Sequence, residues 1–308
     1  MKKIRYYRKY INTIIANLTT IKMINNLKNK YLKLSLKILV YPFLFIYNYL
    51  YYIKLLLTNS LYIPYLEIVI TTRCTLKCKK CANFIPQFHN HELINNDNLL
   101  KQIDDLFNNI DYIHTIRLLG GEPFLNKQLP TIIKKILDTK KFHNIVIVTN
   151  GTVLVKDKNL INVLKEDKVS VDISEYNATN KENFIKVLTD NKIKNFVFKP
   201  NFWLDFGNGS YKKRTKEELE KQFVKCNSVC RSYFDGKLFY CAQSSSLYNL
   251  GITKSKTDYL DFANITKKEF FRNKAIDFLT NTKYQNACLY CNKGTKNFIK
   301  IGVADQET

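Results

Sequence analysis

The chain has 308 residues, 49 Lys and Arg against 26 Asp and Glu, a net charge of +23, and 45% hydrophobic residues. Its length suits one large domain with a small appendix, and its apolar content is ordinary for a globular protein. Nucleic acid is an unlikely partner despite the charge, because Lys is scattered through most of the chain and no RNA-binding aromatic signature is present.

Residues 1–60 form a basic helical and aromatic extension. No acidic residue precedes Glu67, and apolar residues from Ile11 to Ile24 fall at near-helical spacing. The uncharged, Tyr-rich run 38–53 contains Pro42 and is shorter than a membrane-spanning helix. Three interpretations stay open: a helix at an anionic membrane surface, a segment that packs on the rest of the protein, or a short span.

From residue 61 to about 205, short β-branched runs alternate with longer amphipathic runs. This pattern predicts βα units around a parallel sheet, an α/β fold of the partial (β/α)6-type TIM barrel class. In barrels of this kind, chemistry gathers at the C-terminal ends of the strands. We expect strands at 66–71, 115–119, 144–149, 169–174 and 194–199, and helices at 98–108, 129–137, 159–165 and 181–188.

Three cysteines follow the first expected strand in the spacing C-x3-C-x2-C: Cys74, Cys78 and Cys81. Thiolates are the usual ligands of [4Fe–4S] clusters, which normally take four, so a three-thiolate site leaves one iron open for a chelating molecule. The alternative is a zinc knuckle with His89 or His91 as the fourth ligand.

The second expected strand ends in Gly120, Gly121, Glu122 and Pro123. With the cysteine loop, this motif resembles the radical S-adenosylmethionine (SAM) superfamily. The resemblance implies that the open iron binds SAM, that Gly120–Pro123 position its amino group, and that one electron cleaves SAM to a 5′-deoxyadenosyl radical. It also implies an electron donor of the flavodoxin or ferredoxin type. Lys80 departs from the family pattern, which has an aromatic residue before the third cysteine.

Two further strand ends carry polar residues. Asn150 follows the third expected strand in Thr-Asn-Gly-Thr, which is also an ordinary turn signal. Ser174 ends the fourth. By the same resemblance, Asn150 shapes the SAM site and Ser174 bonds the ribose or carboxylate of SAM; the alternative is that both are plain loop residues.

We expect residues 206–308 to contain the end of the barrel and a cysteine-rich α+β appendix, with a helix at 212–224 and a hairpin turning at Asp235-Gly236. Its five cysteines are Cys226, Cys230, Cys241, Cys288 and Cys291. The arrangement resembles a twitch or SPASM-like domain, which implies a second, auxiliary [4Fe–4S] cluster. Cys241, Cys288 and Cys291 are the expected ligands, with Cys230 as the fourth and Cys226 as its alternative. A zinc site is the rival interpretation.

The eight cysteines follow no recognisable secretory peptide, so we expect reduced, metal-binding thiols and a cytoplasmic enzyme, peripheral at the inner face of the membrane if the extension binds lipid. The predicted reaction is hydrogen abstraction from a carbohydrate-type or other small metabolite, or a peptide, with the auxiliary cluster transferring an electron. The alternatives are a non-enzymatic zinc or iron–sulfur module at the membrane and an RNA-modifying radical SAM enzyme.

Overall fold

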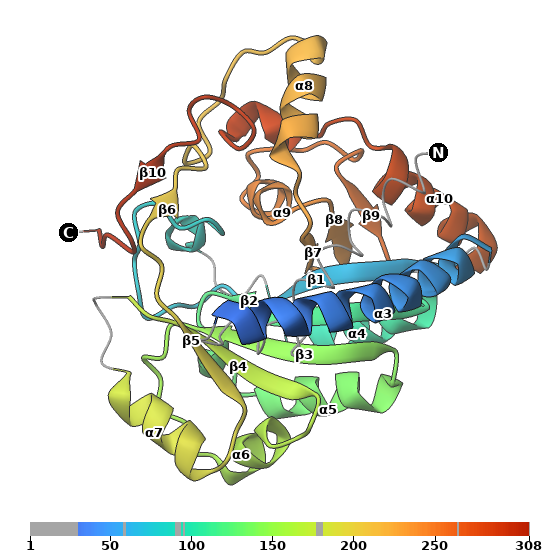
Figure 1. Ribbon diagram of the computed structural model, residues 1–308. Coiled ribbons are helices and arrows are strands. Elements are labelled where there is room, and N and C mark those ends of the chain that lie inside the picture. Colours follow the sequence, from blue (N-terminus) through green and yellow to red (C-terminus); the bar gives the residue numbers. More distant parts are fainter. Residues whose placement is uncertain are drawn as a thin grey trace.

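The computed structural model describes residues 30–57, 60–89, 94, 96–176, 181–263 and 265–307. Their main feature is an eight-stranded sheet with the order β5-β4-β3-β2-β1-β7-β8-β9 (Figure 1). The strands are β1 (Tyr62–Thr71), β2 (Tyr112–Gly120), β3 (Phe142–Thr149), β4 (Val169–Ser174), β5 (Asn195–Phe198), β7 (Arg231–Phe234), β8 (Lys237–Phe239) and β9 (Tyr259–Asp261). A separate two-stranded sheet pairs β6 (Trp203–Leu204) with β10 (Lys300–Ile301).

The first five strands are parallel and in consecutive order, which confirms the predicted α/β fold and its partial barrel. Successive helices connect them: α4 (Asn96–Asn109), α5 (Leu129–Thr139), α6 (Lys158–Leu164) and α7 (Glu182–Asp190). The helices bury apolar stripes against the strands. In α5, for example, Leu129, Ile132, Ile133 and Ile136 are completely buried. This spacing places them on one helix face.

The last third of the chain returns to the first strand. β7 pairs with β1 in parallel, with Leu66 opposite Arg231 and Ile68 opposite Tyr233. β8 and β9 then extend the sheet in antiparallel fashion. The expected hairpin exists, and it continues the barrel sheet. β8 ends at Phe239, and Cys241 is the N-cap of α9 (Ala242–Asn249).

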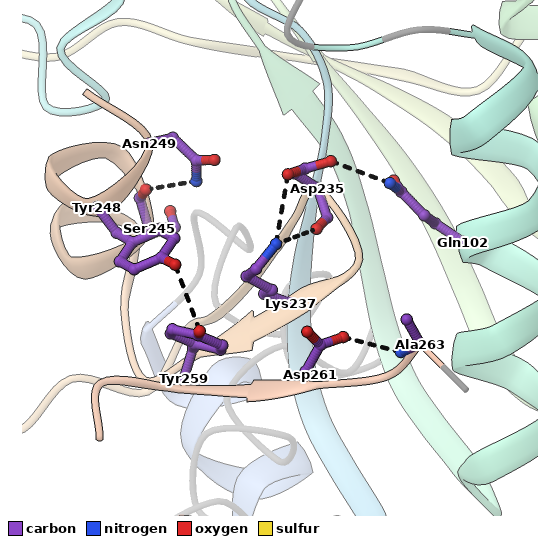
Figure 2. A network of polar contacts seen from close by, with 9 residues as sticks. All are labelled: Gln102, Asp235, Lys237, Ser245, Tyr248, Asn249, Tyr259, Asp261 and Ala263. Atoms are coloured by element: carbon purple, nitrogen blue, oxygen red, sulfur yellow. Dashed lines mark hydrogen bonds and ion pairs between the residues drawn. The ribbon is translucent and has the colours of Figure 1, made fainter. Parts of the chain in front are cut away.

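Polar contacts fix this hairpin to α4 and the neighbouring strand β9 to α9 (Figure 2). At its turn, Asp235 and Gly236 both have positive φ, 49° and 70°, as a two-residue hairpin loop requires. Asp235 accepts a hydrogen bond from Gln102 of α4 at 3.0 Å. On the other side, the hydroxyls of Tyr248 in α9 and Tyr259 in β9 lie 3.3 Å apart.

The remaining helices are α3 (Lys30–Leu57), α8 (Lys216–Cys226) and α10 (Lys268–Asn281), with short 3-10 turns η1 (Ile85–Gln87), η3 (Pro123–Leu125) and η4 (Asn286–Tyr290). α8 begins four residues later than expected because Thr215 and Glu218 form a capping box at its start. The expected amphipathic run 11–24 lies outside the described residues.

The aromatic run of the N-terminal extension lies in one long helix, α3, which passes through Pro42 without a break. Many of its large apolar side chains are exposed, among them Phe43 at 76% and Leu57 at 80%. None of the described helices combines the length and apolar character that crossing a membrane requires.

Candidate functional site

The cysteine loop that follows β1 is held against the end of β2 by its backbone. Gly121 N–H donates to the carbonyl of Thr71 at 2.9 Å, and Glu122 N–H donates to that of Arg73 at 2.7 Å. A Cβ on Gly120 would lie 2.1 Å from the Thr71 carbonyl oxygen, and one on Gly121 would lie 1.9 Å from that of Arg73. The two glycines therefore let the backbone of the cysteine loop lie directly against the end of β2.

Glu122 is fully buried and does not line the cavity beside the cysteines. Its carboxylate accepts hydrogen bonds from Thr149 Oγ1 at 2.7 Å, Asn150 N at 2.9 Å and Phe124 N at 3.2 Å. Burial raises the pKa of this carboxyl, and the three hydrogen bonds counteract the rise. In this structure the Glu122 carboxylate joins the ends of β2 and β3, and neighbouring Pro123 likewise lies outside the cavity lining.

Asn150 connects the end of β3 to the cysteine loop. Its amide Nδ2 donates to Thr75 Oγ1 at 3.0 Å and lies 3.7 Å from Cys74 Sγ. Its Oδ1 accepts from the backbone N–H of Thr152 at 3.0 Å, which closes the Thr-Asn-Gly-Thr turn. The motif is therefore a turn, and this turn connects the end of β3 to the cysteine loop.

Cys74, Cys78 and Cys81 line one cavity of about 660 Å³ at the C-terminal ends of the barrel strands. Gly120, Gly121, Asn150 and Ser174 line the same cavity, so the structure brings four of the six expected SAM-binding residues together there. Deeper in the barrel, Glu67 and Arg117 also contribute to its wall, with Arg117 Nη1 3.4 Å from Glu67 Oε1.

Aromatic residues form much of the opposite wall, and the sequence did not single out most of them. Tyr176 stacks edge-on against Trp203 at 5.3 Å between ring centroids, and Phe198, Phe202 and Phe206 also line the cavity. The nearby thiols Cys74, Cys78 and Cys81 help to raise the pKa of Tyr176, after burial as the main cause. Only Tyr176 had a signal in the sequence, its place just after a strand end.

Burial raises the pKa of all three thiols of the loop, to about 11 for Cys74. In the metal-free protein these groups are therefore neutral at pH 7. A bound metal deprotonates a coordinating thiol outright, so this donor set fits a cationic cluster that replaces the protons.

A second cysteine set gathers around α9. Cys226, Cys241, Cys288 and Cys291 line a cavity of only about 40 Å³. They come from the end of α8, the N-cap of α9 and η4. Each of the other three thiols contributes to raising the pKa of Cys241, whose main cause is burial. All four donors are sulfur, which is the usual ligand type of iron–sulfur clusters.

Cys230 is elsewhere. Burial first and the charge of neighbouring Glu67 second raise the pKa of its thiol to about 12. It does not line the cavity of the second set. The structure thus groups Cys226 with the other three thiols, whereas the first choice from the sequence was Cys230.

Polar side chains support the loop that carries Cys288 and Cys291. Arg214 Nη1 donates to the carbonyl oxygens of Cys288 at 2.5 Å and Cys291 at 3.1 Å. Gln222 Nε2 donates to the Cys291 and Lys293 carbonyls, both at 3.0 Å. Sequence reasoning missed both residues, because neither lies in a recognisable motif.

Within the described part of the chain, no three Cys, His, Asp or Glu side chains are grouped closely enough to be recognised as a single-ion site. His89 is exposed, and His91 lies outside the described residues.

Residues 68–197 match the family model described as the Radical SAM superfamily. Among curated proteins, the chain is similar to the GTP 3′,8-cyclase of Aquifex aeolicus, with 25% identity over 232 residues, 73% of this chain and 65% of that enzyme. A GTP 3′,8-cyclase of Campylobacter jejuni subsp. doylei is 38% identical over 118 residues, 36% of this chain and 35% of that enzyme. The chain therefore spans less than two thirds of these relatives.

Two solved structures are also similar. BtrN in complex with AdoMet and 2-DOIA gives a TM-score of 0.45 at 16% identity, covering 75% of this chain and 93% of that one. Native anSMEcpe with bound AdoMet gives 0.43 at 13% identity, covering 76% of this chain and 92% of that one.

Proposed function

We propose, on the premise that this chain is a radical SAM enzyme, that Cys74, Cys78 and Cys81 hold its catalytic [4Fe–4S] cluster and that SAM binds in the adjoining cavity. The observation that carries the proposal is the lining of one cavity by all three thiols of the loop together with Gly120, Gly121, Asn150 and Ser174. A three-thiolate cluster leaves one iron for a chelating ligand.

When bound, the cluster and SAM supply a 5′-deoxyadenosyl radical that abstracts hydrogen from the substrate. The chain's own residues orient and shield these groups. Glu122 and Asn150 fix the cysteine loop through the bonds described above, and Ser174 presents a hydroxyl to the cavity. The aromatic wall around Trp203 reduces the access of water to the reacting atoms.

We propose a small metabolite of carbohydrate type as the substrate, with a peptide as a wider possibility. Among the described residues that line the cavity, Lys80, Arg117 and Lys199 are cationic and Glu67 is the one carboxylate, and aromatic rings lie beside them. Such a lining suits a ring-shaped molecule with an anionic group. The similarity to GTP 3′,8-cyclases favours a purine nucleotide as the second candidate.

We propose further that Cys226, Cys241, Cys288 and Cys291 hold an auxiliary [4Fe–4S] cluster that transfers an electron. Their shared small cavity supports this set over one with Cys230. Four thiolates would occupy every iron, so electron transfer fits this site better than substrate binding. The external reductant would be a flavodoxin or ferredoxin.

Anaerobic reconstitution tests this function. We expect about eight irons and eight sulfides per chain and reductive cleavage of SAM to 5′-deoxyadenosine. The variant Cys78→Ala should lose SAM cleavage and about half of the iron, whereas Cys230→Ala should keep both. Stoichiometric zinc without iron in the wild-type protein would contradict the proposal and support the metal-binding alternative. Salt-sensitive binding to tRNA would support RNA as the substrate.

The exposed apolar side chains of α3 support a peripheral contact with an anionic membrane surface. Tyr31, Ile38 and Phe43 are 83%, 66% and 76% exposed, and no acidic residue occurs in the helix. Basic, aromatic helices of this kind bind anionic lipid at the interface. The full chain should sediment with phosphatidylserine vesicles more than with phosphatidylcholine vesicles, and Phe43→Asp should weaken it. Equal sedimentation with both would argue against this contact.

A further inference from the structure

The cysteine loop is covered by a segment 228 positions away in the sequence. Lys79 N–H donates to the Asp305 carbonyl at 2.8 Å, and Glu307 N–H donates to the Lys77 carbonyl at 2.7 Å. Between them, Cys78 and Gln306 form an antiparallel β-bridge. Residues 304–307 therefore bind the loop as a short extra strand, and we call them the strap.

The Gln306 side chain makes this contact specific. Its Oε1 accepts from Lys77 N–H at 2.8 Å, and its Nε2 donates to Cys78 Sγ at 3.2 Å and to the Ala304 carbonyl at 2.5 Å. The hydrogen bond to sulfur opposes the burial that raises the pKa of the Cys78 thiol. The Gln306 amide thus accepts a hydrogen bond from the loop backbone and donates one to a sulfur of the cysteine loop.

The strap is itself anchored close to the cavity. β10 pairs with β6, with Lys300 opposite Leu204 and Ile301 opposite Trp203. Figure 1 shows β6, β10 and the C-terminal end on the same side of the molecule. Asp205, just after β6, also makes an ion pair with Lys80 at 3.2 Å. The strap is therefore connected, through β10 and β6, to residues that line the cavity.

We propose that Gln306 is a positioning residue for the SAM cluster: it orders the loop around Cys78 and raises the reduction potential of the cluster through its N–H···S hydrogen bond. Hydrogen bonds to sulfur are among the features that set iron–sulfur potentials. Reduction adds negative charge to the cluster and its sulfurs, so a donated N–H stabilises the reduced form more than the oxidised form. The redox part of this inference rests on the proposed function, whereas the ordering part does not.

The test compares Gln306→Met, which removes the donor and the acceptor, with Gln306→Glu, which keeps an acceptor but adds a charge. Asn297→Met is the matched control, an exposed amide in the same part of the chain. The first measurement is alkylation of the metal-free protein by iodoacetamide, followed cysteine by cysteine by mass spectrometry. Cys78 is only 7% exposed, and we expect its labelling to be severalfold faster in Gln306→Met and unchanged in Asn297→Met.

The second measurement is the midpoint potential of the EPR signal that changes when SAM is added. We expect the potential to fall from wild type to Gln306→Met and further to Gln306→Glu, with Asn297→Met equal to wild type. For a one-electron couple, a tenfold change in the reduction equilibrium corresponds to about 59 mV. Equal potentials in all four proteins would overturn the tuning role, and unchanged Cys78 labelling would overturn the ordering role. If no SAM-sensitive signal forms in the wild type, the proposed function fails instead, while the labelling result still stands.

Discussion

The two cysteine sets differ in how the chain builds them and in the space that they enclose. Cys74, Cys78 and Cys81 come from one loop at the end of β1 and line a cavity of about 660 Å³. The second set comes from α8, α9 and η4 and lines only about 40 Å³. The difference teaches that one short motif can supply all the thiols of a roomy site, whereas the thiols of the closed site come from several elements packed together.

We call the cavity of Cys74, Cys78 and Cys81 the open site and that of Cys226, Cys241, Cys288 and Cys291 the closed site. The open site should be the more sensitive to a side chain added where two backbone segments lie close together. In Gly121→Ala, the new Cβ would lie 1.9 Å from the Arg73 carbonyl oxygen, so the cysteine loop must move. We expect a loss of about 3 kcal/mol or more in the free energy of unfolding, measured by urea denaturation, together with loss of SAM cleavage.

Gly251→Ala is the control for this variant, because Gly251 has positive φ but a Cβ there would meet no atom within 4 Å. Its cost should be only about 1–2 kcal/mol. Equal effects of the two substitutions would show that the close approach of the cysteine loop is not the reason for Gly121.

The closed site should depend on Cys226 and not on Cys230. Cys226→Ser is expected to lower the iron content from about eight to about four per chain, because it removes one of four ligands. Cys230→Ser should leave the iron unchanged, since that thiol does not line the small cavity that the other four thiols share. Iron and sulfide analysis after anaerobic reconstitution measures both. Loss of iron in Cys230→Ser but not in Cys226→Ser would identify Cys230 as the fourth ligand.

Gln222 supports only the closed site. Gln222→Met leaves the carbonyls of Cys291 and Lys293 without their amide donor. We expect a loss of about 1–3 kcal/mol in the free energy of unfolding and slower loading of the second cluster. The SAM-sensitive EPR signal should keep its intensity, and its weakening would mean that the two sites are not independent. Gln102→Met, which affects the hairpin contact to Asp235, is the comparison variant.

The smallest effect is expected at Lys80, where the family pattern has an aromatic residue. Its ion pair with Asp205 is 3.2 Å long, but 41% of the Lys80 side chain is exposed, so water screens it. Lys80→Met should change the free energy of unfolding by less than about 0.5 kcal/mol in urea denaturation. A loss above about 1 kcal/mol would show that this pair holds the cysteine loop more firmly than an exposed ion pair can.

The barrel and the open site could be predicted because their signals are local. The β-branched runs and the spacing of Cys74, Cys78 and Cys81 report structure within a few residues. The closed site was only half predictable: Cys288 and Cys291 form a local pair, but the choice between Cys226 and Cys230 depends on where α8 ends. The helix ends at Cys226 because Asn227 adopts a left-handed backbone with φ of 47°, which the cysteine spacing does not record.

Glu122 and Gln306 show the other limits. Glu122 was recognised by its motif, yet its bonds to Thr149 and Asn150 depend on how β2 and β3 end side by side. Gln306 has no motif, and its contact with Cys78 joins opposite parts of the sequence. Long-range pairings of this kind leave no periodic pattern for a sequence to display.

The pairing of β7 with β1 has a consequence for synthesis. Leu66 and its partner Arg231 are 165 positions apart, so at translation rates of about 5–20 residues per second the partner emerges on the order of ten to thirty seconds later. During that interval one edge of an almost wholly apolar central strand lacks its neighbour. A nascent chain of this protein therefore offers chaperones a defined target, and one that disappears when the ribosome has passed the hairpin.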